Sequence, residues 1–521
     1  MPDSSSSAQE FPQIISFFKS EHFKNRVNNL LAEWHAPGLS LAIVSNKNVS
    51  SQGFGLASLD PETPCTPDTI FDIASSSKSL TAAAVGLLVE DDEKYQAVKW
   101  DAKMHDLLPE DFVLNKDSFT EEVTVEDILS HRSGVPGHDD AFFGLRSKNP
   151  DSAKTTTRRL RHLPISKPLR TEYQYCNTMF TVATHLVETL TEKTFGEYIA
   201  ESFLQPLGMN DTHLQPSAVK AAGKESRLAL PYQWNESKQI LELGKVQEVP
   251  DAQGAGSIQT SVNDHIKWVQ ALMYRDGPVT KELYEGLTRV RIVQDTESSP
   301  EGRAPFASFT GYAAGLEVSY YRGYQIVGHD GMISGYSSRH FWMPEFEFGA
   351  VMLGNSESAG SVIDVLSKEL IDEILEVPME KRVDWNARAH QVDEKYQAFM
   401  NKSVAQDLKP DLEHPEPLKM PLSAYVGEYW NVGYRGLSIG VRDGKLFVDA
   451  TERTMGFWLE FEHLADQSVF IVKLKDYYDG LSVERAAEFR FQNDQVVKVG
   501  IDFEDDYDGY IWFDKVEQNG E

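Results

Sequence analysis

Residues 73–79 read IASSSKS and place a serine, Ser75, three positions before a lysine, Lys78. A β-type run at residues 69–74 leads into this stretch, and an Ala- and Leu-rich run at residues 80–89 follows it. The pattern predicts a strand or loop that delivers the chain into the start of a buried helix. Residues three apart on the first turn of a helix share a face, so the lysine amine lies within reach of the serine hydroxyl.

Serine and lysine at this spacing fit nucleophilic catalysis. A serine hydroxyl is a weak nucleophile until a neighbouring base removes its proton, and Lys78 can be that base if it is kept uncharged. Burial and nearby cationic groups lower the pKa of a lysine in this way. The free N–H groups of a helix start also favour the oxyanion that forms when a carbonyl is attacked. The S-x-x-K pattern alone is nonspecific, since it arises by chance in many chains.

Two further patterns follow downstream. Tyr175 and Asn177 lie just before a predicted helix at residues 178–191 and offer a phenol that relays a proton and an amide that holds a substrate. His329-Asp330-Gly331 ends a strand-like run, where the small glycine lets a substrate approach the strand edge. The order of the three patterns along the chain is more specific than any one of them.

Competing catalytic signatures are absent from the sequence. It contains no H-E-x-x-H, C-x-x-C or Walker pattern, and Gly53-Phe54-Gly55 is not completed to G-x-G-x-x-G. Residues 38–42 lack the second glycine of a G-x-S-x-G elbow. These absences disfavour metal and nucleotide chemistry, and we predict neither a metal ion nor a cofactor.

The three patterns together resemble the S-x-x-K, Y-x-N and K/H-x-G motifs of the penicillin-binding-protein and β-lactamase-related serine hydrolases, especially the class C β-lactamase-like branch. Their contexts are similar too, at residues 73–79, 129–135 (LSHRSGV), 206–209 (PLGM) and 328–331 (GHDG). The similarity covers about residues 20–375. It implies an α/β (α+β) β-lactamase/transpeptidase-like domain, with an antiparallel sheet flanked by helices and an all-helical subdomain.

The resemblance also implies roles for single residues. It makes Ser75 the acylated nucleophile, with Lys78 and Tyr175 sharing the general-base and general-acid roles. Asn177 would orient the substrate amide or ester, and the backbone N–H groups of Ser75 and Met332 would form the oxyanion hole. The expected substrate-binding residues are Asn177, His329, Gly331 and Met332.

One departure from the β-lactamase pattern limits the substrate. Penicillin-recognising members carry lysine in the third motif, whereas this chain has His329, which is mostly neutral at pH 7 and anchors a carboxylate poorly. Asp330 beside it adds negative charge. The site should therefore prefer esters, amides or D-aminoacyl amines without a free carboxylate, as in the esterase and D-aminopeptidase members that the triplet resembles. Lactamase action is not expected as the main function.

The expected function is that of a serine hydrolase acting on a small ester, amide, (D-)aminoacyl or peptide substrate through an acyl-Ser75 intermediate. Two alternatives stay open. The same residues would also serve an acyltransferase, transesterase or peptide cyclase of secondary metabolism, which hands the acyl group to an alcohol or amine. A catalytically silent binding or scaffold protein is the alternative from another class.

The chain divides into three parts. Residues 11–376 are expected to form the catalytic domain, which opens with an amphipathic helix at residues 11–34. Residues 377–421 combine a charged helix with a proline-containing linker. Residues 422–521 alternate regularly and carry the hairpin signal Asp443-Gly444, which predicts a small β-barrel or sandwich. The family resemblance makes this part a lipocalin-like barrel.

Composition and charge narrow the partners. The 521 residues are 41% hydrophobic and 25% charged, which excludes disorder for most of the chain. The net charge of −30 repels phosphate backbones and anionic lipids, so no nucleic-acid partner is expected. No apolar run approaches the roughly 20 residues of a membrane span, the first residues do not read as a signal peptide, and only two cysteines occur. We predict a cytoplasmic protein with a small-molecule partner and no membrane contact; the oligomeric state stays open.

Two other features have competing interpretations. Residues 137–170 carry eight Lys and Arg side chains, which form either a loop paired with its own acidic surroundings or a substrate-facing lid with affinity for anions. His131 is expected to hold a loop by hydrogen bonds rather than take part in the chemistry.

Overall fold

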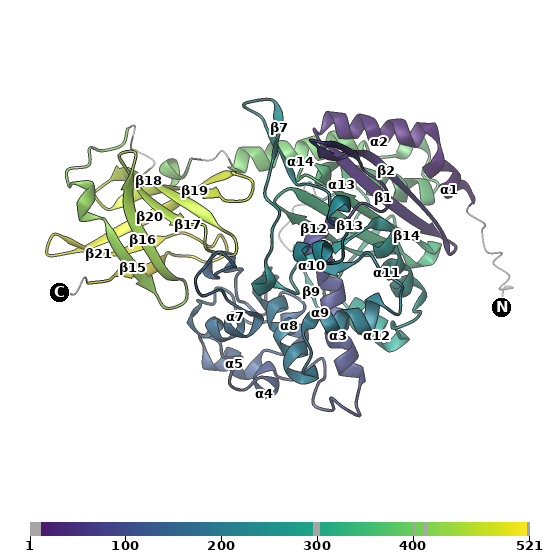
Figure 1. The fold of residues 1–521 in the computed structure, drawn as a ribbon, viewed down its shortest axis with the longest axis horizontal. Helices are drawn as coiled ribbons and strands as arrows, with labels where there is room; N and C mark the ends of the chain where they lie inside the picture. Colours follow the sequence, from purple (N-terminus) through teal and green to yellow (C-terminus); the bar gives the residue numbers. More distant parts are fainter. Residues whose placement is uncertain (1–11, 295–302, 401–402, 410–411, 413, 518–521) are drawn as a thin grey trace.

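The computed structural model describes residues 12–294, 303–400, 403–409, 412 and 414–517. Residues 11 and 295–302 of the expected catalytic domain, residues 401, 402, 410, 411 and 413 of the expected linker, and the last four residues of the expected barrel lie outside these ranges. The described chain forms a large α/β domain and a β-barrel, with α14 (Trp385–Met400) running from the first toward the second (Figure 1).

The large domain is built on an antiparallel sheet of nine strands. Their order is β3-β2-β1-β14-β13-β12-β11-β10-β9, so the first and last long strands of the domain, β1 and β14, are neighbours in its middle. The bounds are β1 Gly38–Ser45, β2 Asn48–Leu59, β3 Glu62–Pro64, β9 Ile292–Val293, β10 Gly311–Tyr312, β11 Glu317–Tyr321, β12 Tyr324–Ile333, β13 Tyr336–Met343 and β14 Phe348–Gly354.

Helices cover both faces of this sheet. Those that contact its strands are α1 Pro12–Lys19, α2 Glu21–Glu33, α11 Val262–Tyr274 and α13 Ala359–Ile374. Helix α3 Lys78–Glu90 packs against α8 Asn177–Thr191 and α12 Lys281–Thr288. Successive residues of β1 point to opposite faces: Leu41 and Ile43 pack in one core with α2 and α13, while Ala42 and Val44 pack in the other with α3 and α11. This two-sided burial explains why every residue of β1 is buried.

Shorter elements lie outside this nine-stranded sheet. The helices are α4 Met104–Leu107, α5 Asp117–Glu122, α6 Val125–Ile128, α7 Ala153–Arg159, α9 Phe195–Ile199, α10 Pro216–Ala221 and α15 Val404–Leu408, and the short strands are β4 Phe71–Asp72, β5 His213–Leu214, β6 Tyr232–Asn235, β7 Ile240–Leu243 and β8 Ile258–Thr260. Helices α4 to α9 follow one another as the helical part of the domain, in agreement with the expected fold class. Within the ranges described, no helix combines the length and the apolar character needed to cross a bilayer.

The predicted helix at residues 11–34 is two helices, and its residue 11 lies outside the described ranges. The break falls at Ser20, whose hydroxyl accepts the Phe23 N–H and thereby caps the N-terminus of α2. A serine in an N-cap competes with continuation of the helix, and the apolar periodicity alone does not reveal this.

The basic stretch at residues 137–170 is paired mainly with carboxylates. Five of its eight cations form ion pairs with acidic side chains; they are Lys154, Arg158, Arg159, Lys167 and Arg170. The interpretation as a loop that neutralises its own acidic surroundings is therefore confirmed for these five. A sixth, Arg146, donates to the backbone oxygens of Thr451 and Arg453 in the barrel.

The C-terminal part is a closed barrel of eight strands, so the barrel alternative is confirmed over the sandwich. The strands are β15 Gly427–Asn431, β16 Arg435–Arg442, β17 Lys445–Ala450, β18 Phe457–Ala465, β19 Val469–Asp476, β20 Ser482–Gln492, β21 Gln495–Ile501 and β22 Ile511–Lys515. Asp443 and Gly444 form the predicted hairpin turn, with φ of 51° and 77°. Positive φ at both central residues is the geometry whose twist matches a β-hairpin.

The barrel docks on the helical part of the large domain through the segment between β17 and β18, residues 451–456, which we call the barrel loop. Gly144 N–H donates to Glu452 O and Thr454 N–H to Phe142 O, both at 3.0 Å, so the loop pairs with the large domain like a short strand. Arg453 is 1% exposed and donates to Asp140 O at 2.7 Å and Tyr434 O at 2.9 Å. Because these bonds are buried, the barrel loop is held in one position.

Candidate active site

Ser75 lies on a tight turn, residues 74–77, at the start of α3. The preceding Ala74 has φ of 44°, a left-handed conformation that costs free energy for a residue with a Cβ. Asp72 holds this conformation: its carboxylate accepts the Ala74 N–H at 2.7 Å and the Gln259 side-chain amide at 2.6 Å. The strained turn therefore fixes the position from which Ser75 meets the two hollows described below.

Lys78 is fully buried and contacts Ser75 directly. Its Nζ lies 2.9 Å from Ser75 Oγ, 2.8 Å from Asn177 Oδ1 and 2.8 Å from Ala255 O. None of these partners is charged, and burial lowers the pKa of Lys78 from 10.5 to about 7. A neutral amine has two N–H bonds and one lone pair. Since Asn177 Oδ1 and Ala255 O only accept, they take the two hydrogens, and the lone pair faces the Ser75 hydroxyl.

Tyr175, which lies just before α8, contacts the Ser75 hydroxyl oxygen as well. Its hydroxyl donates to Ser75 Oγ at 2.7 Å, and burial raises the pKa of the phenol, so it stays protonated. His131 supports this position, because its Nδ1 accepts the Cys176 N–H at 3.0 Å and its ring lies 4.1 Å from the Tyr175 ring. The expectation that His131 holds a loop by hydrogen bonds is confirmed.

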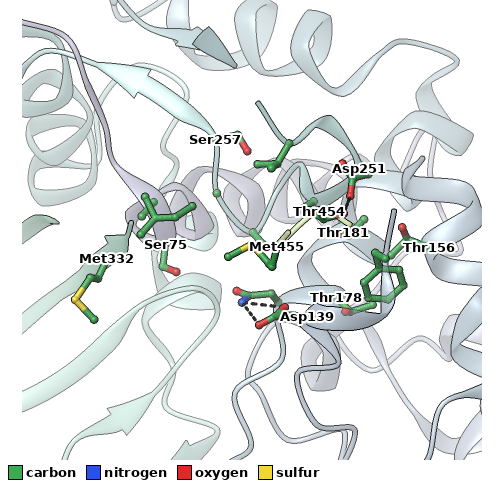
Figure 2. Close-up of a pocket in the computed structure, with 18 residues that line it drawn as sticks. Ser75, Asp139, Thr156, Thr178, Thr181, Asp251, Ser257, Met332, Thr454 and Met455 are labelled. Carbon is green, nitrogen blue, oxygen red and sulfur yellow. Dashed lines mark hydrogen bonds between the residues drawn. The ribbon is translucent and has the colours of Figure 1, made fainter. Parts of the chain in front are cut away.

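Asn177 is oriented by an acidic residue that the sequence analysis missed. Asn177 Nδ2 donates to both oxygens of Asp139, at 3.1 and 3.3 Å, so its Oδ1 must be the atom that faces Lys78 (Figure 2). The Asp139 carboxylate also raises the pKa of Lys78 and opposes the larger effect of burial. No motif contains Asp139; it precedes Tyr175 by 36 positions in a stretch without periodicity.

Both ring nitrogens of His329 have hydrogen-bond partners within the protein. Its Nδ1 lies 2.5 Å from Asp330 O and its Nε2 lies 2.9 Å from the Tyr312 hydroxyl. Burial, with a smaller contribution from Lys78, lowers the pKa of His329 to about 4. The imidazole is therefore neutral at pH 7, with Nδ1 donating and Nε2 accepting, and it offers no positive charge to a carboxylate.

Gly331 brings strand β12 against the turn that carries Ser75. A Cβ at this position would lie 2.2 Å from Ile73 O and 2.9 Å from Ser76 N. The group close to this glycine is therefore the backbone on either side of Ser75. The sequence analysis expected a substrate to approach here instead. The neighbouring Met332 has a side chain that is 65% exposed and borders both hollows beside Ser75.

Two hollows meet at Ser75. The first, the barrel-side cavity, encloses about 120 Å³ and is bordered by Asn177 and by Thr454 and Met455 of the barrel loop (Figure 2). The second, the strand-side hollow, encloses about 430 Å³ and is bordered by Tyr175 and by residues of β11 to β13. Within the described ranges, no group of three or more His, Cys, Asp or Glu side chains is placed to hold a metal ion.

The fold and this serine–lysine–tyrosine cluster define a serine hydrolase of the β-lactamase and penicillin-binding-protein type. Residues 23–366 match the family model described as Beta-lactamase, and the chain belongs to this family. Residues 413–515 match a second model, described as a domain of unknown function, DUF3471.

The chain is also similar to named relatives. The chain is 35% identical over 502 residues to an unguisins hydrolase of Aspergillus campestris, covering 95% of this chain and 92% of the relative. It is 32% identical over 463 residues to an unguisins hydrolase of Aspergillus violaceofuscus, covering 85% and 81%. Among solved structures, the octameric penicillin-binding protein homologue from Pyrococcus abyssi has the same fold, with a TM-score of 0.59 at 21% identity over 94% of this chain and 99% of that one.

Proposed function

We propose that this protein hydrolyses an amide or ester bond in a small aminoacyl or peptide substrate, through a covalent acyl-Ser75 intermediate. One observation carries the proposal: the Nζ of buried Lys78 lies 2.9 Å from Ser75 Oγ and 2.8 Å from two neutral acceptors, Asn177 Oδ1 and Ala255 O. Burial lowers the pKa of Lys78 to about 7, and the neutral form of the amine directs its lone pair to the Ser75 hydroxyl. A lysine held charged by a carboxylate would not accept that proton.

The contacts support a balanced acylation step. Lys78 takes the proton of Ser75 as Oγ bonds to the substrate carbonyl carbon, and the backbone N–H groups of Ser75 and Met332 are the proposed donors to the oxyanion. Tyr175 then gives its proton to the leaving nitrogen or oxygen as the scissile bond breaks. The Lys78 ammonium, 4.8 Å from the centre of the Tyr175 ring, favours the resulting phenolate.

Deacylation restores both groups. The Tyr175 phenolate removes a proton from water, whose oxygen attacks the acyl carbon. Ser75 Oγ leaves and recovers its proton from Lys78. If an alcohol or amine replaced the water, the same protons would move, and the product would be an ester or amide instead of an acid.

The two hollows separate the halves of the substrate. Tyr175 borders the strand-side hollow and is the proposed acid for the leaving group, so the leaving group would occupy that hollow and the acyl part the barrel-side cavity. The strand-side hollow contains Glu317, Asp330 and Asp364 but a single cation, Arg339, which already pairs with both aspartates. Together with a neutral His329, this disfavours a free carboxylate on the leaving group.

The relatives support hydrolysis. Two chains with 35% and 32% identity to this one are named as hydrolases of unguisins, and we propose that the present chain acts on a compound with the same type of scissile bond.

The proposal is tested by labelling and turnover. A fluorophosphonate should add one mass increment to the Ser75 peptide, and Ser75→Ala should show none. A panel of p-nitrophenyl esters, D- and L-aminoacyl anilides and a chromogenic cephalosporin should give turnover with the esters or anilides and little with the cephalosporin. Partitioning of the product on addition of an alcohol would favour acyl transfer, and the absence of any adduct would favour the scaffold alternative.

A further inference from the structure

The barrel contributes residues to one of the two hollows beside Ser75. Thr454 and Met455 of the barrel loop border the same cavity as Ser75 and Asn177. In Figure 2, Ser75 and Met332 lie toward one end of this cavity, Thr156 and Asp251 toward the other, and Met455 between them in this view. A segment almost 400 positions after the nucleophile therefore borders the same cavity.

Three residues that border this cavity each have one buried polar side-chain atom without a hydrogen-bond partner among the residues that the structure describes. These atoms are Thr156 Oγ1, Asp251 Oδ1 and Ser257 Oγ. Their residues are at most 2% exposed, so bulk solvent does not pair with them. A buried polar atom without a partner costs about 1–3 kcal/mol. Three such atoms around one cavity, one of them on a carboxylate, indicate that a polar ligand supplies the missing partners.

The barrel loop determines which oxygen of the Asp251 carboxylate has no hydrogen-bond partner. The Thr454 hydroxyl donates to Asp251 Oδ2, so Oδ1 remains as the acceptor at the cavity border. The carboxylate itself lies on the segment at residues 250–252 of the large domain. Apolar side chains, among them Phe142, Val249 and Met455, border the cavity together with these polar groups. A lining that combines apolar surface with hydrogen-bonding groups complements a peptide, which carries N–H and C=O groups as well as side chains.

We propose that the barrel loop completes a subsite for a peptidyl or N-acylaminoacyl group on the acyl side of the scissile bond. In this subsite Asp251 Oδ1 accepts a substrate N–H, and the hydroxyls of Thr156 and Ser257 donate to substrate carbonyl oxygens. The inference rests on the proposed acyl-Ser75 chemistry and adds to it the class of acyl group and the residues that select it.

The subsite is tested with two esters that share a leaving group. p-Nitrophenyl acetate reaches Ser75 but is too short for the subsite, whereas the p-nitrophenyl ester of an N-acetylated amino acid, in both enantiomers, extends into it. We expect Asp251→Leu to lower kcat/KM for the longer ester by about 100-fold, because the substrate N–H then loses its hydrogen-bond acceptor. Asp251→Asn keeps one acceptor oxygen and should lower kcat/KM by about tenfold. Turnover of the acetate should change less than about twofold.

Matched variants of the barrel loop separate contact from folding. Thr454→Val removes the bond to Asp251 and should lower kcat/KM for the longer ester by about tenfold. Thr451 lies in the same loop, but its hydroxyl donates to Asp449. Thr451→Val should therefore leave kcat/KM for both esters unchanged. Equal losses on both esters in the Asp251 variants, or no loss on the longer ester, would overturn the subsite.

Failure of the proposed chemistry is recognised separately. If wild-type protein gave neither a fluorophosphonate adduct nor turnover, the acyl-Ser75 mechanism would be wrong. The subsite would then be judged by calorimetric binding of an N-acetyl-aminoacyl amide to Ser75→Ala. Binding weakened about tenfold by the added Asp251→Leu change would support the subsite, and unchanged binding would refute it.

Discussion

The two ends of the barrel-side cavity differ in how their polar atoms are paired. At the Ser75 end, Lys78 makes three hydrogen bonds within 2.9 Å and Tyr175 donates to the same serine oxygen. At the far end, Thr156 and Asp251 each keep one polar atom without a partner among the described residues. The first end is ready for chemistry before a substrate arrives, while the second has hydrogen-bonding capacity left for the substrate.

This difference separates rate from selectivity. Groups that already contact one another at the Ser75 end act on every substrate that reaches the serine, because they move the proton and stabilise the charge of the reaction itself. Groups at the far end act only on substrates long enough to reach them. Substitutions at the two ends should therefore produce different kinetic patterns.

The largest effect is expected at the paired end. Lys78→Ala removes the base and should lower kcat by about 10³- to 10⁵-fold for short and long esters alike, since nucleophile and base act as a unit. Ser75→Ala should abolish both turnover and the fluorophosphonate adduct. Stopped-flow measurement of p-nitrophenol release gives both values, and a Lys78→Ala enzyme that kept a tenth of its activity would mean that another group is the base.

A second change tests the backbone support of this end. Gly331→Val places a Cβ within 2.2 Å of Ile73 O, so β12 and the Ser75 turn must separate. We expect a loss of about 100-fold or more in kcat for all substrates, because displacement of catalytic groups by about 1 Å is sufficient for such a loss. Gly440→Ala is the control, as a Cβ there meets nothing within 4 Å. Far-ultraviolet circular dichroism should show that both variants fold.

The pH dependence of acylation reports the charge of Lys78. Because its pKa is about 7, the rate should fall about tenfold per pH unit below that value as the amine becomes protonated. Asp139 raises this pKa, so Asp139→Asn should move the acidic limb of the profile toward lower pH. Single-turnover rates from pH 5 to 9 measure the shift, and movement toward higher pH would contradict the assignment.

The smallest effect is expected in stability at the unpaired end. Thr156→Val replaces a buried hydroxyl that has no partner among the described residues, and should raise the free energy of unfolding by about 1 kcal/mol. Thr184→Val is the control, because the Thr184 hydroxyl donates to Gln253 O at 2.8 Å. Loss of this bond should lower the free energy of unfolding by about 1 kcal/mol. Urea unfolding of both variants measures the two changes in the free energy of unfolding. A loss for Thr156→Val equal to that for Thr184→Val would mean that the Thr156 hydroxyl is paired.

The sequence predicted the paired end better than the unpaired one. Ser75, Lys78, Tyr175 and Asn177 lie in motifs whose chemistry requires contact, and the structure brings them together across about 100 positions of chain. The hairpin turn at Asp443-Gly444 was predictable because its conformation depends on two neighbouring residues. Residues that belong to a motif or to a single turn can therefore be predicted from the sequence.

The groups that were missed depend on contacts between distant segments. Asp139 and Asp251 lie in loops without periodicity, and Thr454 becomes part of the cavity only because Arg453 and the backbone of residues 142–144 dock the barrel. No local pattern reports such docking. The left-handed Ala74 is similarly invisible in the sequence, since its conformation is held by Asp72 and not by its own preference.

The most direct test of the account is the titration of Lys78 itself. Protein carrying ¹³C-labelled lysine side chains should show one Cε resonance that titrates at about pH 7 and is missing from Lys78→Ala. A Lys78 resonance that titrates near the ordinary value of 10.5 would mean that the amine is charged at neutral pH and does not take the proton of Ser75.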